Sequence, residues 1–451
     1  MPLFRFAALA LALTAVAAHA APAAVPGADA IVTRTLDNGL KIVVWPDHDI
    51  PNVAVYTWYR AGGRNEYPGI TGLAHYFEHM MFNGTSTRAP GEFDRTMENA
   101  GGSNNAYTSN DVTVYQDWFP KDALDIIFDL ESDRMANLDF DPKVVESERG
   151  VVYSERRSSV DENNIGALVE QMQATAYIAH PYQFPVIGWP SDIERWTIDD
   201  LKTFYRTYYA PNNATMFVVG DVEPDTVFAL AQKYFAKIPR QAPPKAVTTV
   251  EPEQRGERRV TLEKADAQTP VLALAYHVGN ARHEDATATE LLVSILADGD
   301  SSRLHQRIVE QEQAAIGIGS NVEQGFDPGL VFFYALLPPE GDVAKVEALF
   351  DEELARIVRE GITPAELAKA TKQHQAAFWR AIATISGKAQ ALGSHEIFHG
   401  DYNALFDAPT QVAGVTGAQI QAVAARVLRT SNRTVGVLKP VPGAADAADQ
   451  E

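Results

Sequence analysis

The chain has 451 residues, of which 46% are hydrophobic and 22% are charged, and its formal net charge is −21. This length predicts two or three domains, the composition argues against wholesale disorder, and the negative charge disfavours nucleic acid as a partner because phosphates would be repelled. There is no cysteine, so disulfides and thiolate metal sites are excluded, and any metal must be bound by His, Asp or Glu.

The first 20 residues have the pattern of a secretory signal peptide. One arginine in MPLFRF precedes the apolar run AALALALTAVAA, and AHA predicts cleavage after Ala20. A membrane anchor is the alternative, but this run is shorter than the roughly 20 apolar residues that a spanning helix needs. No later stretch is long and apolar enough to span a membrane. We expect a cleaved signal and export, with a bacterial periplasm as the compartment.

The rest of the chain is divided into two similar halves. The first extends from about residue 30 to 239 and the second from about 258 to 440. Residues 240–257, rich in proline and charge, predict an extended linker. The tail at 441–451 is expected to be disordered.

Strand-like and helical segments recur in both halves. Short apolar runs bounded by turn residues predict strands at 36–45, 53–63, 213–222, 271–279, 329–338 and 433–441. Longer patterns predict helices at 122–138 and 342–361, and Thr363-Pro364 marks another helix start. We therefore expect an α+β fold of two homologous domains, each a mainly antiparallel β-sheet flanked by helices.

The stretch GLAHYFEHMMFNGT, residues 72–85, carries the chemistry. At 100° per residue a helix here places the apolar side chains on one face: Leu73, Phe77, Met80 and Met81. His75, Glu78 and His79 fall on the opposite face. The two histidines are one turn apart and can converge on a zinc ion, while Glu78 is placed to take a proton from the metal's water. This is the pattern HxxEH, although a polar surface helix could also produce it.

A zinc hydrolase usually has three protein ligands and an open position. The third ligand could come from a downstream helix that begins at Asp141-Pro142. Glu148 and Glu155 are two turns apart on one face of this helix. Either could be the ligand on chemical grounds, and a solvated charged face is the alternative.

In these motifs the sequence resembles the pitrilysin–insulinase family of zinc peptidases, in the branch of mitochondrial processing peptidase. The resemblance covers nearly all of the chain after the signal. It rests on LDNGLKIVV, GITGLAHYFEHMMFNGT, GGSNNAYTSNDVTVY, ESERGVVYSE and YYAPNNATMFVVGDV, which occur in the family's order.

The resemblance implies a role for each candidate residue. It makes Glu155 the third zinc ligand beside His75 and His79, Glu148 a supporting acid, and Glu78 the general base. It also implies that the segment GGSNNAYTS is an edge strand along which the peptide substrate lies, with Asn105 and Ala106 at its centre.

The second half departs from the family pattern. Self-sufficient members carry an Arg and a Tyr there that hold the substrate and stabilise the oxyanion, but these positions are Val309 and Ile316 in this chain. Arg303 and Arg307 are nearby but do not align with the role. We therefore expect the zinc-bearing subunit of a heterodimer, whose partner is a related chain that lacks HxxEH and supplies Arg and Tyr.

The sequence thus predicts an exported zinc endopeptidase that cuts peptides or unfolded protein segments, with one Zn²⁺ per chain. Two alternatives stay open. One is a non-catalytic assembly or binding subunit that keeps the peptidase fold. The other is an enzyme that removes a leader peptide from one dedicated substrate.

Overall fold

The computed structural model describes residues 25–441. The predicted signal peptide, and all but the first residue of the predicted tail, lie outside the described residues. Among the residues that are described, no helix is long and apolar enough to cross a membrane.

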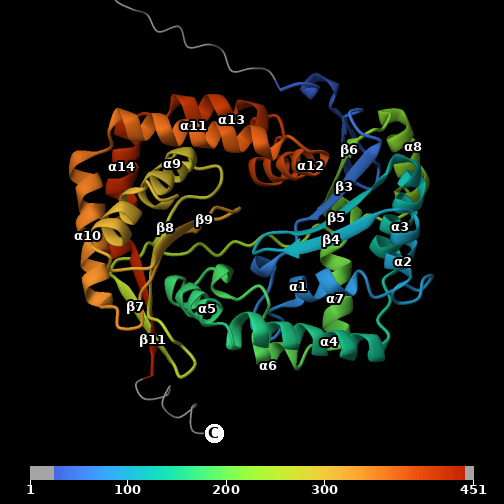
Figure 1. The fold of residues 1–451 in the computed structure, drawn as a ribbon. Helices are drawn as coiled ribbons and strands as arrows, with labels where there is room; N and C mark the ends of the chain where they lie inside the picture. Colours follow the sequence, from blue (N-terminus) through green and yellow to red (C-terminus); the bar gives the residue numbers. More distant parts are fainter. Residues whose placement is uncertain (1–24, 442–451) are drawn as a thin grey trace, which may run out of the picture.

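The first half is built on a six-stranded sheet in the order β1-β2-β6-β3-β5-β4 (Figure 1). All neighbouring strands are antiparallel except β2 and β6. The turn predicted at Asn38-Gly39 joins β1 to β2, and Gly39 has a φ of 96°, which favours glycine. The strands are β1 (Val32–Thr35), β2 (Lys41–Pro46), β3 (Asn52–Tyr59), β4 (Ser103–Thr108), β5 (Thr113–Pro120) and β6 (Ala214–Gly220).

The second half repeats this plan with a five-stranded sheet in the order β7-β11-β8-β10-β9. It again contains one parallel pair, β7 with β11, among antiparallel neighbours. Its strands are β7 (Arg258–Lys264), β8 (Val271–His277), β9 (Gly317–Glu323), β10 (Leu330–Leu336) and β11 (Arg433–Pro440). The prediction of two homologous α+β domains with mainly antiparallel sheets is confirmed.

Helices flank both sheets. Those of the first half are α1 (Leu73–Met80), α2 (Glu92–Asn99), α3 (Leu124–Asn137), α4 (Pro142–Arg156), α5 (Asn164–Ala176), α6 (Pro190–Ile193), α7 (Ile198–Tyr208) and α8 (Pro224–Phe235). Those of the second half are α9 (Ala286–Ala297), α10 (Val343–Glu360), α11 (Pro364–Ala381), α12 (Ile385–Ser394), α13 (Ala404–Gly414) and α14 (Gly417–Val427). The predicted helix starts are confirmed, because the side chains of Asp141 and Thr363 accept hydrogen bonds from the first-turn amides of α4 and α11.

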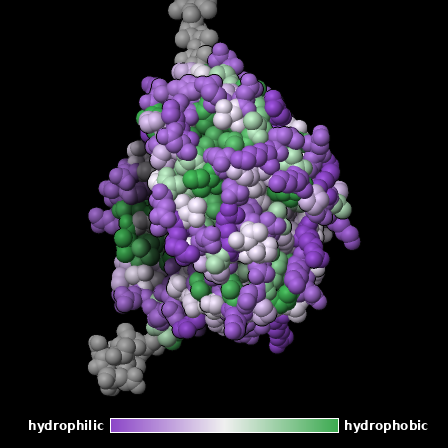
Figure 2. Space-filling model, turned by 90° about the vertical axis from the view of Figure 1, so that its right-hand side faces the viewer, coloured by the Kyte–Doolittle hydropathy of each residue, from purple (hydrophilic) through white to green (hydrophobic). Residues whose placement is uncertain are grey.

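Each sheet has one face packed against helices of its own half. In the first half α1, α3, α4, α7 and α8 form this core, and in the second half α9, α10 and α14 do so. The outer surface over α3 and α8 carries mostly hydrophilic side chains with apolar ones interspersed (Figure 2). The amphipathic patterns of the sequence account for these two layers.

The opposite face of each sheet is covered by a helix from the other half. Helix α12 packs on β3 and β6 of the first sheet, and α5 packs on β7, β8 and β11 of the second (Figure 1). The fit is close at Gly393 of α12, where a Cβ atom would lie 2.3 Å from the buried Trp58 ring. We call this arrangement the helix exchange. It joins the halves through two apolar interfaces.

Candidate metal centre and catalytic site

Helix α1 begins at a tightly built turn. Gly72 has a φ of 90°, and a Cβ there would lie 2.6 Å from the carbonyl oxygen of Ile187, so glycine is required. The carboxylate of Glu66, only 3% exposed, accepts hydrogen bonds from the amides of Gly72 and Ala74, both at 2.7 Å. Burial raises the pKa of Glu66 well above its usual range, and the two amide hydrogen bonds oppose this shift. The positive end of α1 is therefore held by a buried acid that sequence reasoning missed.

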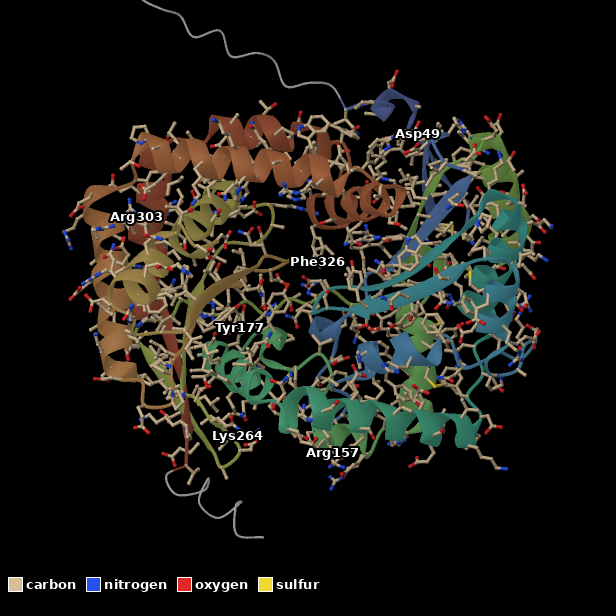
Figure 3. The ribbon with its side chains drawn as sticks, viewed as in Figure 1. Asp49, Arg157, Tyr177, Lys264, Arg303 and Phe326 are labelled. Carbon is tan, nitrogen blue, oxygen red and sulfur yellow. The ribbon has the colours of Figure 1, made fainter. Side chains whose placement is uncertain are left out.

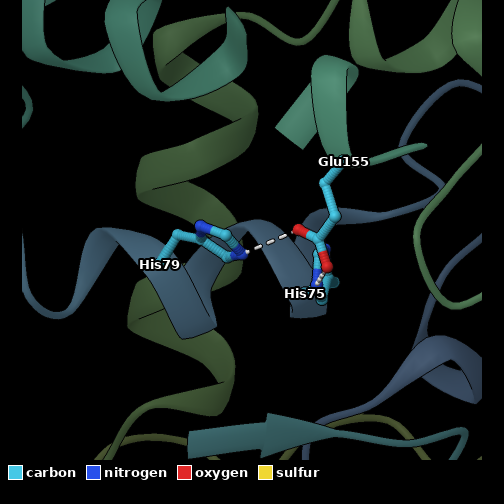
Figure 4. Close-up of side chains that lie close together, drawn as sticks. All are labelled: His75, His79 and Glu155. Carbon is cyan, nitrogen blue, oxygen red and sulfur yellow. Dashed lines mark ion pairs between the residues drawn. The ribbon is translucent and has the colours of Figure 1, made fainter. Parts of the chain in front are cut away.

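Helix α1 projects His75 from its first turn and His79 from its last turn toward Glu155 of α4 (Figure 4). Nε2 of His75 lies 3.7 Å from one carboxylate oxygen of Glu155, and Nε2 of His79 lies 3.3 Å from the other. The three ligand atoms lie within 4.8 Å of one another. The ligand histidines are spaced as HxxxH, and Glu78 between them is not part of this group. The donors suit Zn²⁺ in number and type, because two imidazole nitrogens and one carboxylate oxygen can bind this ion and leave a fourth position open, as catalytic zinc requires.

The second acid of α4 contacts the far side of His79. Nδ1 of His79 lies 2.8 Å from Glu148, whose other oxygen accepts a hydrogen bond of 2.8 Å from the amide of Asn83. This contact fixes the imidazole so that Nε2 faces Glu155. In the structure Glu155 is therefore close to both histidines, whereas Glu148 contacts only the Nδ1 side of His79. The two acids, which were equivalent on chemical grounds, thus have different positions.

The charges around the two rings differ. Burial lowers the pKa of His75 to about 4. Burial also acts to lower the pKa of His79, but the hydrogen bonds that its ring donates to the carboxylates of Glu148 and Glu155 outweigh burial and raise the value to about 9. The hydrogen bond with His79 lowers the pKa of Glu155. The two carboxylates therefore stabilise a positive charge at His79, and carboxylates in this position also favour a bound cation.

Glu78 points to the edge strand instead of the ligand group. Its Oε2 accepts a hydrogen bond of 2.6 Å from the hydroxyl of Thr108, the last residue of β4. Burial raises the pKa of Glu78, and the Thr108 bond opposes this shift. A raised pKa makes a carboxylate a better proton acceptor near neutral pH. Thr108 lies within the quoted segment GGSNNAYTS, but no role for it was predicted.

Strand β4 is one of the two edge strands of the first sheet, and it is the one that lies beside α1. It pairs with β5 on one side, with Asn105 opposite Gln116 and Ala106 opposite Tyr115, and no strand of residues 25–441 pairs with its other side. The Asn105 side chain is exposed, whereas Ala106 packs against the core that contains α1. Both residues lie where an added peptide strand would run.

In the second half, Val309 and Ile316 have apolar side chains that can form no hydrogen bond with a substrate. Val309 packs against the second core, and Ile316 is 56% exposed just before the edge strand β9. Neighbouring arginines are already engaged, since Arg303 pairs with Glu366 at 2.6 Å and Arg307 lies 3.3 Å from Glu352. Within residues 25–441 this segment therefore offers no unengaged arginine to the site.

Cavity size does not locate the centre. A cavity of about 1130 Å³ lies in the second half between α9, α11 and α13, and none of the three ligand residues lines it. The convergence of donor atoms identifies the candidate metal centre instead.

Comparison with known proteins agrees with this geometry. Residues 41–188 match the family described as Insulinase (Peptidase family M16), and residues 195–373 match Peptidase M16 inactive domain. The chain is 33% identical to Zinc protease PqqE of Helicobacter pylori over 90% of this chain and 92% of that one. It is 25% identical to the probable mitochondrial-processing peptidase subunit beta of Schizosaccharomyces pombe, over 92% of both.

A solved structure gives the same result. The crystal structure of a protease from Helicobacter pylori has a TM-score of 0.88 and 31% identity, and the match covers 91% of this chain and 99% of that chain. The likeness therefore includes both halves and their arrangement.

Proposed function

The chain belongs to the insulinase family of peptidases, family M16, and on this basis we propose that it is a zinc-dependent endopeptidase. One observation carries the proposal: the three donor atoms of His75, His79 and Glu155 converge, while Glu78 stands beside them without joining the ligand group. If α1 were an ordinary surface helix, its polar face would be expected to face solvent and not to pack against the acidic side chains of α4.

The donor set fits zinc, the metal named for several relatives. A zinc ion held by His75, His79 and Glu155 would act as a Lewis acid that polarises the scissile carbonyl and lowers the pKa of water. Glu148 keeps the His79 ring in the ligating orientation. Glu78 accepts a proton at its carboxylate from the attacking water, and Thr108 holds that carboxylate in place.

The free edge of β4 supports an extended peptide as substrate. Backbone groups of an incoming strand would pair with Asn105 and Ala106, so the peptide would be bound with little regard to most of its side chains. Because the same strand ends at Thr108, the scissile bond would be placed beside Glu78. Unfolded segments and peptides, rather than folded proteins, are the matching substrates.

We further propose that this chain is the zinc-bearing subunit of a heterodimer. Val309 and Ile316 cannot donate side-chain hydrogen bonds to an oxyanion, and loss of one such donor costs roughly 10²–10³ in rate in a well-studied enzyme. A relative named as a peptidase subunit, that of S. pombe, supports a paired assembly. The partner would be a related chain that lacks HxxEH and carries the Arg and Tyr.

Metal analysis and peptide cleavage test the proposal, with and without a candidate partner chain. Wild type should bind one zinc ion and cleave unstructured peptides, with a sharp rise on mixing. Glu78→Gln should keep zinc and lose cleavage, because the base is not a ligand. Glu146→Gln is the control, since this α4 side chain is 75% exposed. A chain that binds no zinc and cleaves nothing even with a partner would instead be a non-catalytic assembly subunit.

The signal-like first 20 residues support export to a periplasm as part of the proposal. Cell fractionation tests this location. Recovery of the protein in the cytoplasm with residues 1–20 still attached would contradict it.

A further inference from the structure

The loop that joins β9 to β10, residues 324–329, crosses from the second half to the first. We call it the bridging loop, and its Phe326 lies near the middle of the molecule (Figure 3). The amide of Phe326 donates a hydrogen bond of 3.1 Å to the carboxylate of Asp111 in the first half. A Cβ atom at Gly325 would lie 1.9 Å from the same carboxylate, so this close approach requires glycine. The loop is therefore fitted closely against the first half.

Asp327 of the bridging loop forms a charged contact between the halves. Its carboxylate pairs with the guanidinium of Arg64 and lies 3.1 Å from Nε2 of the buried His180. Arg64 also lies 3.3 Å from Asp111, and its side chain is only 15% exposed. Burial acts to raise the pKa of Asp327, but His180 and Arg64 outweigh it and lower the value. Removing one member of such a group leaves another charge uncompensated, so the contact costs more to break than an exposed ion pair.

Arg64 lies in the turn that precedes the metal-bearing helix. This turn, residues 63–65, leads directly into Glu66, whose carboxylate accepts hydrogen bonds from the first amides of α1. A shift of Arg64 would move the residue that caps α1, because the two are only two positions apart. Asp327 holds Arg64 from the second half, so it acts on this turn without joining the ligand group.

The same contacts reach the end of the edge strand. Strand β4 ends at Thr108, whose hydroxyl donates a hydrogen bond to Glu78, and Asp111 lies in the turn that follows. The backbone amide of Arg64 donates a hydrogen bond of 2.8 Å to the carbonyl of Asn110 in that turn. The bridging loop contacts both turns, through Arg64 and Asp111. It therefore fixes the turn before α1 and the turn after β4 relative to each other.

We propose that Asp327 is a positioning residue for the metal centre, which acts through Arg64 to keep α1 and the end of β4 in their relative places. The inference rests on the proposed peptidase function and concerns the control of the same site. It gives a role to the half that holds none of the proposed zinc ligands, since residues 195–373 match the family's inactive domain and include the bridging loop. This half contributes geometry and not a reacting group.

Amide hydrogen exchange in the metal-free protein tests this role without turnover. Asp327→Asn keeps the shape of the side chain and removes its charge. The capped amides of α1, those of Gly72 and Ala74, should exchange roughly threefold faster in the variant. Zinc affinity, measured by competition with a chelator, should fall by a similar factor. Asp125→Asn is the matched control, because it breaks an exposed ion pair with Lys233 and should change neither quantity.

Cleavage is measured separately, at saturating zinc and with the partner chain. Asp327→Asn should lower kcat by roughly tenfold, since a small displacement of reacting groups is costly. KM should stay within about threefold, because the peptide would pair with the middle of β4. Arg64→Gln should lose at least as much as Asp327→Asn, because it also frees Asp111, and the double variant should match Arg64→Gln since both changes break one contact.

Unchanged exchange at Gly72 and Ala74 would overturn the positioning role, and so would an unchanged kcat where wild type cleaves. A contact that only stabilises the fold would lower the urea midpoint and leave kcat as in wild type. If Asp327→Asn does not fold, Arg64→Lys, which keeps the charge but not the forked contact, must show the same losses to a smaller degree. Faster exchange in the variant of a protein that cleaves no peptide would contradict the peptidase proposal alone.

Discussion

Glu66→Gln probes how the buried acid holds the helix that carries the metal ligands. The two oxygens of Glu66 accept hydrogen bonds of 2.7 Å from the amides of Gly72 and Ala74. Glutamine has nearly the same shape but one acceptor oxygen, and its NH₂ group would face the other amide N–H. One buried donor would lose its partner, because the NH₂ group cannot accept its hydrogen bond.

An unsatisfied buried donor costs about 1–3 kcal/mol, so we expect a destabilisation of about 2 kcal/mol. Because His75 directly follows Ala74, loosening this turn should also weaken zinc binding. Urea unfolding of the metal-free protein gives the first quantity, and competition with a chelator gives the second. Glu146→Gln is the control, because this side chain of α4 is exposed. If Glu66→Gln unfolds within about 0.5 kcal/mol of this control, the range of an ordinary surface change, the capping argument is refuted.

Two further predictions follow from other contacts. Glu148→Ala should weaken zinc binding by roughly 10–100-fold in chelator competition, because it removes the partner that orients a ligand ring. Gly393→Ala should lower the urea midpoint, since its Cβ would lie 2.3 Å from the buried Trp58 and overpacking costs about 1–3 kcal/mol. Gly150→Ala, where the added Cβ would meet no other part of the protein within 4 Å beyond its own helix backbone, should raise the free energy of unfolding by up to about 1 kcal/mol; equal shifts in the two variants would contradict the packing argument.

Local patterns were enough to predict much of the architecture. The turn at Asn38-Gly39 and the helix starts at Asp141 and Thr363 depend on residues adjacent in sequence, so each could be predicted from a short stretch of sequence. The same holds for His75 and His79, whose convergence follows from helical spacing.

Contacts between distant segments could not be derived in this way. Glu66 and Thr108 are single polar residues, and their roles depend on where α1 lies relative to a loop and to a strand end. The choice between Glu148 and Glu155 needed a family resemblance, because both lie on one helix face. The helix exchange could not be predicted from the sequence either. The amphipathic pattern of α5 shows that one of its faces is buried, but it does not show which sheet covers that face.

The helix exchange has a consequence for how the molecule comes apart. One apolar face of each sheet is covered by a helix of the opposite half. If one half unfolded, an apolar face of the other sheet would therefore be exposed to water. The two domains should therefore open as one cooperative unit, even though the chain between them at 240–257 contains no helix or strand. Zinc bound at α1 and α4 would then slow amide hydrogen exchange in β8 and β11, which lie in the half that holds none of its ligands.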